Sequence, residues 1–405
     1  MGTLKAKESN VDVSLGSGNL SHAGTISAEK GDVTLTASLN TFKDSNVSGN
    51  AVTISGEVKG DSLNVKSTGQ TKFDTTVLDV DSALVVDAES ISGLEKVEVT
   101  AGTIALTSEK DLELNKLTAE KSSVLVNAKA ANVVFNSDLS AKHGITVNAG
   151  AVTMKDAEAE INAGSNIDIK AQTLTAEGSL SLSSTAGSAD MNVEQKVEVE
   201  KELTVKGHSG ATVSATALEA QSTFIGSDSG TALLKTNTLT SDSLNMTSTE
   251  GDVAFKVLSE EAKPNITIED SIDLKSGKNL DVSALNHYDN LELKKDLRLS
   301  AEKGELTGLN SSSKLSIVAG NVEILAKTGA QTIAKVQAAG TVNVAVEDLS
   351  IGEVEAKEKI TLAGTKKVSV GQVTSTGDAN GDILVKSSEG EVLATGTIQS
   401  KSGGV

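Results

Sequence analysis

The 405-residue chain has no cysteine, no tryptophan and a single proline. Without cysteine it can form neither disulfide bonds nor thiolate metal sites. Aromatic residues make up only 1% of the sequence. Because a wide globular core uses large aromatic side chains to fill its volume, this scarcity favours a narrow core filled by valine, isoleucine, leucine and alanine.

Positive charge and long apolar runs are also scarce. The 36 basic residues face 55 acidic ones, the formal net charge is −19, and Arg298 is the sole arginine. Binding to a phosphate backbone depends on clustered lysine and arginine, so we expect no nucleic-acid partner. The sequence contains no run of about 20 apolar residues, the length that a membrane-spanning helix needs. We therefore also expect no membrane span.

What the chain does contain is a short pattern repeated along its length. A Gly, Asn or Asp is followed by alternating apolar and polar residues, often ending in Ala, with clear copies at residues 33–37, 84–88, 124–128, 145–149 and 167–171. Alternation with a period of two places one side chain of each pair on a buried face and the next in water. The pattern predicts half-buried β-strands.

The spacing of the copies indicates how these strands are arranged. Their first apolar residues are Val33, Val52, Leu84, Ile104, Val124, Ile145 and Ile167, with Leu63 as a weaker copy in the one long gap. Repeats of roughly 20 residues without a helical stretch fit a solenoid, in which each unit buries its apolar face against the next. We therefore predict an all-β fold, a parallel β-helix (β-solenoid) of roughly 20-residue coils, with about 20 coils stacked about 4.8 Å apart.

No linker or change of composition interrupts the pattern, so we expect a single continuous β-solenoid over residues 1–405, less regular at about 190–290. Proline cannot donate a hydrogen bond to a strand ladder, and a loop or coil insertion is expected near Pro264. The pattern begins almost directly after Met1, which suggests a piece of a longer protein. Unpaired strand edges at the ends would favour end-to-end association of copies.

The repeats at residues 31–37, 144–150 and 321–326 resemble the stalk repeats of filamentous haemagglutinin-type exoproteins, large bacterial adhesins exported by two-partner secretion. The resemblance implies a secreted or cell-surface protein that acts in attachment or aggregation and binds a host or bacterial receptor or a polysaccharide. The Asn-Pro-Asn motif of that family's secretion domain is absent, since Pro264 is followed by Asn265 and Ile266. The resemblance therefore implies a stalk, with a surface-layer or fibre subunit as the alternative.

Polysaccharide lyases and hydrolases also use parallel β-helices, and their chemistry needs paired carboxylates or acidic residues that hold Ca²⁺. The candidates are Asp79 with Asp81, and Asp156 with Glu158 and Glu160, whose alternate spacing places each set on one face of a strand. Solvated outward positions explain both sets equally well. A chain with so few aromatic residues has little with which to build a sugar groove, so we expect no enzyme, cofactor or metal site.

Two further motifs have a simple structural explanation. His287, Tyr288 and Asp289 bring polar functional groups together after Pro264 and form a candidate partner-binding loop, although a plain loop explains them as well. The tripeptides at residues 30–32 and 59–61, both Lys-Gly-Asp, are similar to an integrin-type recognition sequence. Gly and Asp are also the residues that turns between strands require, and we predict turns at both places.

Overall fold

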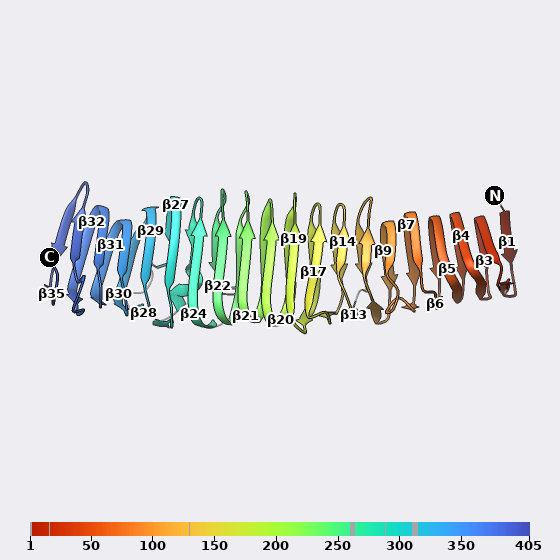
Figure 1. Ribbon diagram of the computed structural model, residues 1–405, viewed down its shortest axis with the longest axis horizontal. Coiled ribbons are helices and arrows are strands. Elements are labelled where there is room, and N and C mark those ends of the chain that lie inside the picture. The colour runs from red at the N-terminus through yellow and green to blue at the C-terminus, as the bar shows by residue number, and fades with distance from the viewer. Residues whose placement is uncertain (1, 16, 129, 260–263, 288, 310–314) are drawn as a thin grey trace. The chain divides into compact units, whose positions relative to one another are not determined.

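The computed structural model describes the chain except for residues 1, 16, 129, 260–263, 288 and 310–314. The chain divides into two compact units, Met1–Lys201 and Glu202–Val405. About 71% of the chain is β-strand, and the strands pair in parallel as stacked coils of about 21 residues, about 18 turns in all. The predicted β-solenoid is therefore confirmed. Figure 1 shows the strands of successive coils side by side within each unit.

The first unit contains the strands β1 (Gly2–Ala6), β2 (Val11–Ser14), β3 (Asn19–Ala28), β4 (Val33–Gly49), β5 (Val52–Ser67), β6 (Gln70–Asp74), β7 (Leu78–Ala88), β8 (Ser90–Ser92), β9 (Val99–Ser108), β10 (Leu112–Leu114), β11 (Leu117–Ala119), β12 (Val124–Asn127), β13 (Asn132–Phe135), β14 (Leu139–Ala141), β15 (Ile145–Asn148), β16 (Ala151–Met154), β17 (Glu158–Ala163), β18 (Ile167–Ala176), β19 (Ser179–Ser184) and β20 (Ser188–Gly207), and the boundary between the units falls within β20.

The second unit contains β21 (Gly210–Ser227), β22 (Ala232–Ser248), β23 (Val253–Lys256), β24 (Asn265–Ser276), β25 (Leu280–Asp281), the 3₁₀ helix η1 (Ser283–His287), β26 (Asn290–Glu292), β27 (Leu297–Thr307), β28 (Ser316–Ala319), β29 (Val322–Thr328), β30 (Ala330–Ala338), β31 (Val342–Ala356), β32 (Ile360–Ser375), β33 (Ile383–Ser387), β34 (Glu391–Ala394) and β35 (Ile398–Ser400). No helix in the described part of the chain is long and apolar enough to cross a membrane.

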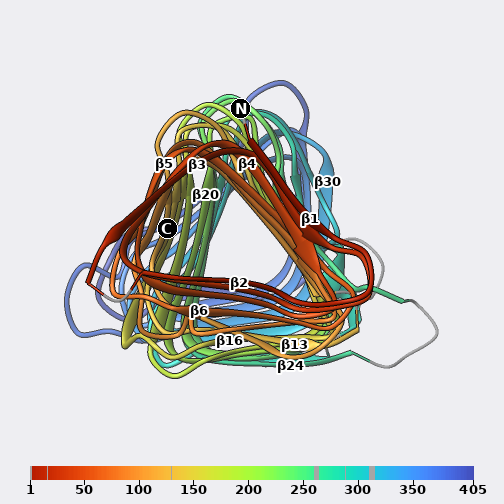
Figure 2. The same cartoon turned by 90° about the vertical axis from the view of Figure 1, so that its right-hand side faces the viewer.

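Each coil has three sides, which appear as a three-sided outline in the end-on view of Figure 2. Short strands occupy one side each, whereas long strands bend at a corner and continue along the next side. Strand β4, for example, pairs with β5 over three separate stretches, and the register shifts between Thr36 and Leu39, where the strand bends. One repeat of the chain therefore holds three apolar-polar alternations instead of one.

The pairing confirms most of the predicted series and corrects its beginning. Leu63, Leu84, Ile104, Val124, Ile145 and Ile167 follow one another as partners on successive coils. Val33 and Val52 belong to a different side, where Val52 pairs with Thr71. The prediction that they form one series with Leu84 was wrong, because the alternation on each side looks alike in the sequence. The long gap between Val52 and Leu84 is a change of side.

The Asn or Asp that precedes many copies of the pattern lies at a corner of the coil and accepts a hydrogen bond from the next coil. Asn166 stands directly before β18, and its Oδ1 accepts a hydrogen bond of 3.0 Å from the backbone N–H of Ser188 one coil further on. Asn321 does the same before β29, accepting from the N–H of Thr341 at 2.9 Å. These bonds satisfy backbone donors where the ladder is interrupted, and they join neighbouring coils.

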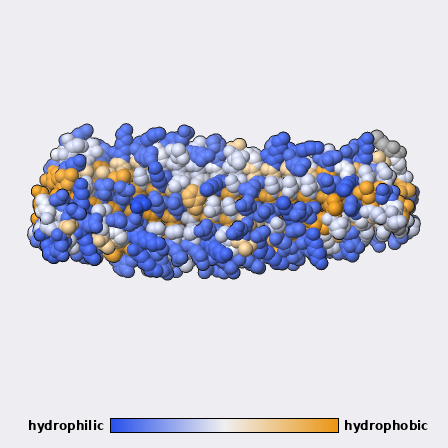
Figure 3. All heavy atoms as spheres, viewed as in Figure 1, coloured by the Kyte–Doolittle hydropathy of each residue, from blue (hydrophilic) through white to orange (hydrophobic). Residues whose placement is uncertain are grey.

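The core of each unit consists of inward-facing Val, Ile, Leu and Ala side chains stacked in columns. One side of the first unit has a column of small residues, in which Ala101, Ala119, Ala141 and Ala163 are successive partners. Four of the five phenylalanines are also buried, so the lumen is wider in places than aliphatic residues alone would fill. Hydrophilic residues cover most of the surface visible in Figure 3.

The second unit varies its coil length. Strands β21 and β22 pair with a constant offset along their whole length, from Ala211 with Ala232 to Ser227 with Ser248. The irregularity expected over residues 190–290 is therefore wrong for these two strands. Polar residues such as Thr236 occupy buried positions there, which hides the alternation.

The insertion expected near Pro264 is present. Thr238 on β22 has Ala217 as its partner on the preceding coil and Asn265 on the following coil, so the second of these coils is the longer. The coils from Ile272 to Leu297 and from Leu297 to Val322 also exceed the usual length, and the coil from Val322 to Val342 is shorter again. The strands on either side of the insertion, β23 and β24, both continue to pair with β22.

Candidate functional site

One outer side of the second unit carries a column of polar and charged side chains. Asn245 on β22, Asp273 on β24, Arg298 on β27, Glu323 on β29 and Asn343 on β31 are successive partners on neighbouring coils. Each of them stands between two buried apolar residues of its strand, so each faces outward. Since paired strands lie about 4.8 Å apart, the column repeats a polar group at that interval.

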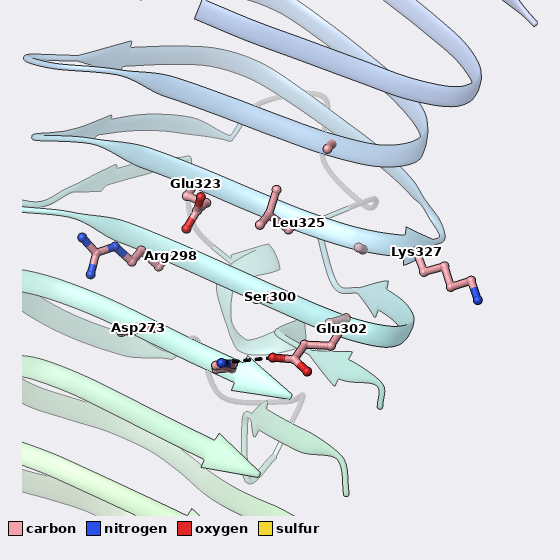
Figure 4. A pocket seen from close by; sticks show the side chains of 11 residues that line it. Asp273, Arg298, Ser300, Glu302, Glu323, Leu325 and Lys327 are labelled. Carbon is pink, nitrogen blue, oxygen red and sulfur yellow. Dashed lines mark ion pairs between the residues drawn. The ribbon is translucent and has the colours of Figure 1, made fainter. Parts of the chain in front are cut away.

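The column from Asn245 to Glu323 lies in a surface groove, which we call the unit-2 groove. It consists of two hollows of about 680 and 220 Å³ that share Asp273 and Arg298 in their linings. The larger hollow continues past Glu323 to the apolar side chains of Leu325 and Ala345. Figure 4 shows these residues spread over several successive strands. The groove therefore combines a charged column with a short apolar strip.

Ion pairs hold three of the four cationic groups of the groove, among them Lys295, whose ammonium lies 2.6 Å from the Asp270 Oδ2 atom. The Arg298 Nη2 atom lies 3.0 Å from the Oδ2 atom of Asp296, two residues earlier on the chain. The Lys275 ammonium lies 3.0 Å from the Glu302 Oε1 atom, on the next coil (Figure 4). Arg298 therefore pairs at the edge of its strand, although carboxylates precede and follow it in the column. A guanidinium has five N–H donors, and this pair uses only part of them.

The two carboxylates of the column differ in their environment. Glu323 accepts a hydrogen bond of 3.2 Å from the amide of Asn343, whereas none of the described residues donates one to Asp273. Burial raises the pKa of the Asp273 carboxyl above its ordinary value, and Glu323 adds to the rise, while Arg298 and Lys275 oppose it. Asp273 is therefore an ionisable group kept in a poorly solvated position.

The groove contains a second acceptor without a donor. The Asn245 Oδ1 atom is buried and accepts no hydrogen bond from any residue that the structure describes. A buried acceptor without a donor costs about 1–3 kcal/mol of desolvation free energy. Together with Asp273 it gives the groove unused acceptors, while Arg298 supplies unused donors.

The first acidic pair predicted from the sequence lies where β7 bends. Asp79 and Asp81 are both exposed, as the outward-facing explanation required. The register of β7 shifts between Val80 and Ala83, so Asp79 lies on one side of the coil and Asp81 at the corner. Both are in β7 on either side of the buried Val80, as the alternation predicted, although the strand bends directly after Val80.

The second acidic set is only partly on one face. Glu158 and Glu160 are exposed on the outer face of β17, as predicted. Asp156 precedes the strand, and its Oδ1 accepts the Glu158 N–H at 3.1 Å. Its role is that of a turn residue. No group of three or more His, Asp or Glu residues that could hold a metal ion occurs within the described ranges.

The candidate partner-binding loop lies between Asp273 and Arg298 in the sequence, but its described residues lie outside the unit-2 groove. His287 is the exposed last residue of η1, Asp289 is exposed just before β26, and Tyr288 lies outside the described residues. The Asp289 carbonyl accepts the N–H of Ser316 at 2.8 Å, which ties this segment to the next coil. The groove is built from β22, β24, β27, β29 and β31, and neither His287 nor Asp289 lines it.

The groove residues were visible in the sequence only as ordinary outward positions. Asp273, Arg298 and Glu323 each occupy the middle of an apolar-polar-apolar triplet. The signal that could have found them is their equal spacing along the chain, which places them on successive coils. The longer coil from Asn245 to Asp273 obscures that signal, because it breaks the series just before these residues.

The chain matches no protein-family model, no curated protein and no solved structure. Its fold and its groove are therefore the basis for a functional proposal. They define a parallel β-solenoid with an outward-facing polar groove on its second unit.

Proposed function

We propose that this chain is an extracellular structural and adhesive β-solenoid, part of the stalk of a bacterial surface adhesin that acts in cell attachment or aggregation. The observation that carries the proposal is the repetition of one three-sided coil through each unit, with apolar residues inward and charged residues outward. A coil in such a stack contacts only its neighbours. Secretion to the cell surface follows from the resemblance of the repeats to adhesin stalks.

Charges on the outer faces support a structural role. Lys110 pairs with Glu89 on the preceding coil at 3.4 Å, and Lys335 pairs with Glu353 on the following coil at 3.1 Å. Each exposed pair contributes only about 0–1 kcal/mol. Their arrangement between coils nevertheless adds to the cohesion of the stack and leaves the surface hydrophilic, which suits a protein exposed to water along its sides.

Deletion of one whole coil tests the structural part of the proposal. Removing residues 124–144 joins Ser123 to Ile145, the partner of Val124 on the next coil, and should leave a folded protein. The control removes residues 124–133, less than half a coil, and should disturb pairing on all three sides. Thermal unfolding followed by circular dichroism distinguishes the two. Equal loss of structure in both deletions would contradict a modular stalk.

Particles coated with the chain test the adhesive part. Coated particles should attach to bacterial or host cells above the level of albumin-coated particles. The whole-coil deletion in the first unit should retain attachment, because it leaves the remaining faces unchanged. Attachment no higher than that of albumin, on a panel of cell types, would contradict the adhesive role.

A carbohydrate-active enzyme is the second candidate, and one observation favours it. Asp273 and Glu323 flank Arg298 in a groove, and two strand spacings of about 4.8 Å place their backbones at a separation close to that of the carboxylates in inverting glycosidases. Incubation with acidic and neutral polysaccharides, with and without Ca²⁺, should produce no new chain ends. Cleavage that disappears in Asp273→Asn and Glu323→Gln would favour the enzyme.

A further inference from the structure

The charge balance of the unit-2 groove selects a class of ligand. The groove is lined by four acidic and four basic side chains, so it is locally neutral on a chain of net charge −19. A polyanion or a polycation would meet as many like charges as opposite ones. A neutral ligand meets no such opposition.

The hydrogen-bonding groups of the groove are complementary to a ligand with many hydroxyl groups. Asp273 and Asn245 present acceptors without a described donor, and Arg298 presents donors beyond its pair with Asp296. A hydroxyl group both donates and accepts, so a polyol can satisfy both kinds. Neutral ligands without hydroxyl groups would leave the buried acceptors unpaired at a cost.

The apolar strip adds a second requirement. Leu325 is half-buried beside Glu323 in the larger hollow, and Ala345 follows it on the next coil. A sugar ring has an apolar C–H face and a rim of hydroxyl groups, which match the strip and the column respectively. Because the column repeats along several coils, more than one ring can lie in the groove.

We infer that the unit-2 groove binds a neutral oligosaccharide whose chain runs across the coils, along the column from Asn245 to Glu323. This inference rests on the proposed adhesive function and gives it a ligand class and a site. The ligand contacts the Asp273 carboxylate and the Arg298 guanidinium through hydroxyl groups and packs a ring face on Leu325.

Calorimetric titration of the purified full chain with cellohexaose, mannohexaose and hexagalacturonate tests the inference. At least one of the two neutral hexasaccharides should bind at least tenfold more tightly than the acidic one. Arg298→Gln and Leu325→Asp should each weaken that binding at least tenfold. Leu125→Asp, the same leucine-to-aspartate change on an outer face of the first unit, should leave it unchanged. Thermal unfolding checks that every variant is folded.

Binding of neither neutral hexasaccharide, preference for hexagalacturonate, or equal affinity of the wild type and both groove variants would each overturn the inference. The outcome is separable from that of the stalk proposal. Cell attachment by coated particles without oligosaccharide binding would leave the adhesin proposal in place and remove this one. Oligosaccharide binding without cell attachment would leave the oligosaccharide site in place and remove the adhesin proposal.

Discussion

The Oδ1 atom of Asp32 accepts a hydrogen bond of 3.0 Å from the backbone N–H of Ala51, the equivalent corner position one coil further along the chain. Asp32 is the last residue of the first Lys-Gly-Asp tripeptide, which forms the predicted turn between β3 and β4. The second tripeptide, residues 59–61, lies inside β5 at a corner where Gly60 has φ of 140°. The same three residues thus have different structural roles.

We expect Asp32→Ala to lower the free energy of unfolding by about 1 kcal/mol, because the Ala51 N–H loses its acceptor. Asp32→Asn keeps an oxygen at the same position and should cost much less. Asp61→Ala is the control, since the Asp61 carboxylate accepts no hydrogen bond from the described residues. Urea unfolding measures all three. Equal losses for Asp32→Ala and Asp61→Ala would show that the inter-coil bond contributes nothing.

Adjacent residues of β12 test the inward and outward alternation. Val126 is 0% exposed, and Leu125 is 38% exposed. Val126→Asp should destabilise the first unit by several kcal/mol, on the order of the cost of an unpaired buried charge. Leu125→Asp places the same charge in water and should be nearly neutral. Thermal unfolding that gave the two variants the same midpoint would reject the assigned faces.

Gly56 is required by both its conformation and its surroundings. Its φ is 93°, and a Cβ atom there would lie 1.7 Å from the carbonyl oxygen of Ala37 on the preceding coil. Gly56→Ala should therefore destabilise the chain by more than about 1 kcal/mol. Gly144→Ala is the control. The φ of Gly144 is not positive, and a Cβ atom there would lie 3.2 Å from the backbone carbonyl oxygen of Asn166. A milder effect at Gly56 than at Gly144 in urea unfolding would contradict the packing at this corner.

The raised pKa of Asp273 predicts a gain of stability on neutralisation. Because the folded chain holds the proton more tightly than the unfolded chain, ionisation of Asp273 lowers stability as the pH rises above about 3.9 and through the folded pKa. Asp273→Asn should therefore raise the midpoint of thermal unfolding at about pH 7. The gain should fade as the pH falls below the unfolded pKa of about 3.9.

Asp281 in the same unit is the control with the opposite sign. Burial alone would raise the pKa of its carboxyl, but the hydrogen bonds from Lys256 and Ser283 outweigh it and lower the pKa. Asp281→Asn should accordingly lower stability at about pH 7, and the loss should fade as the pH falls through the folded pKa. Shifts of the same sign in the two variants would contradict the environments described.

The strands, their parallel stacking and the approximate coil length follow from the sequence, because the period-two alternation directly reports which side chains are buried. The assignment of each strand to a side does not. Val52 and Leu84 begin copies that look alike, and only the pairing of Leu63 with Leu84 distinguishes their sides. Buried polar residues such as Thr236 hide the alternation altogether.

The candidate site was harder to predict than the fold. Its residues are chemically ordinary, and they form a groove only because two successive coils of equal length place Asp273, Arg298 and Glu323 in one column. The residues predicted instead, His287 with its neighbours and the acidic sets, stand close together in the sequence. In a solenoid, residues one coil apart are nearer in space than most residues that are close in sequence.

The connection between β23 and β24 shows that a coil can hold additional residues while its strands keep their pairing. The coil from Thr238 to Asn265 is longer than the coil from Ala217 to Thr238 before it, and the ladders on the adjoining sides continue. The additional residues between Lys256 and Asn265 therefore leave the pairing of β22 with β23 and with β24 in place. A longer segment inserted between β23 and β24 would therefore lie at a height along the stack that depends only on the number of coils before it.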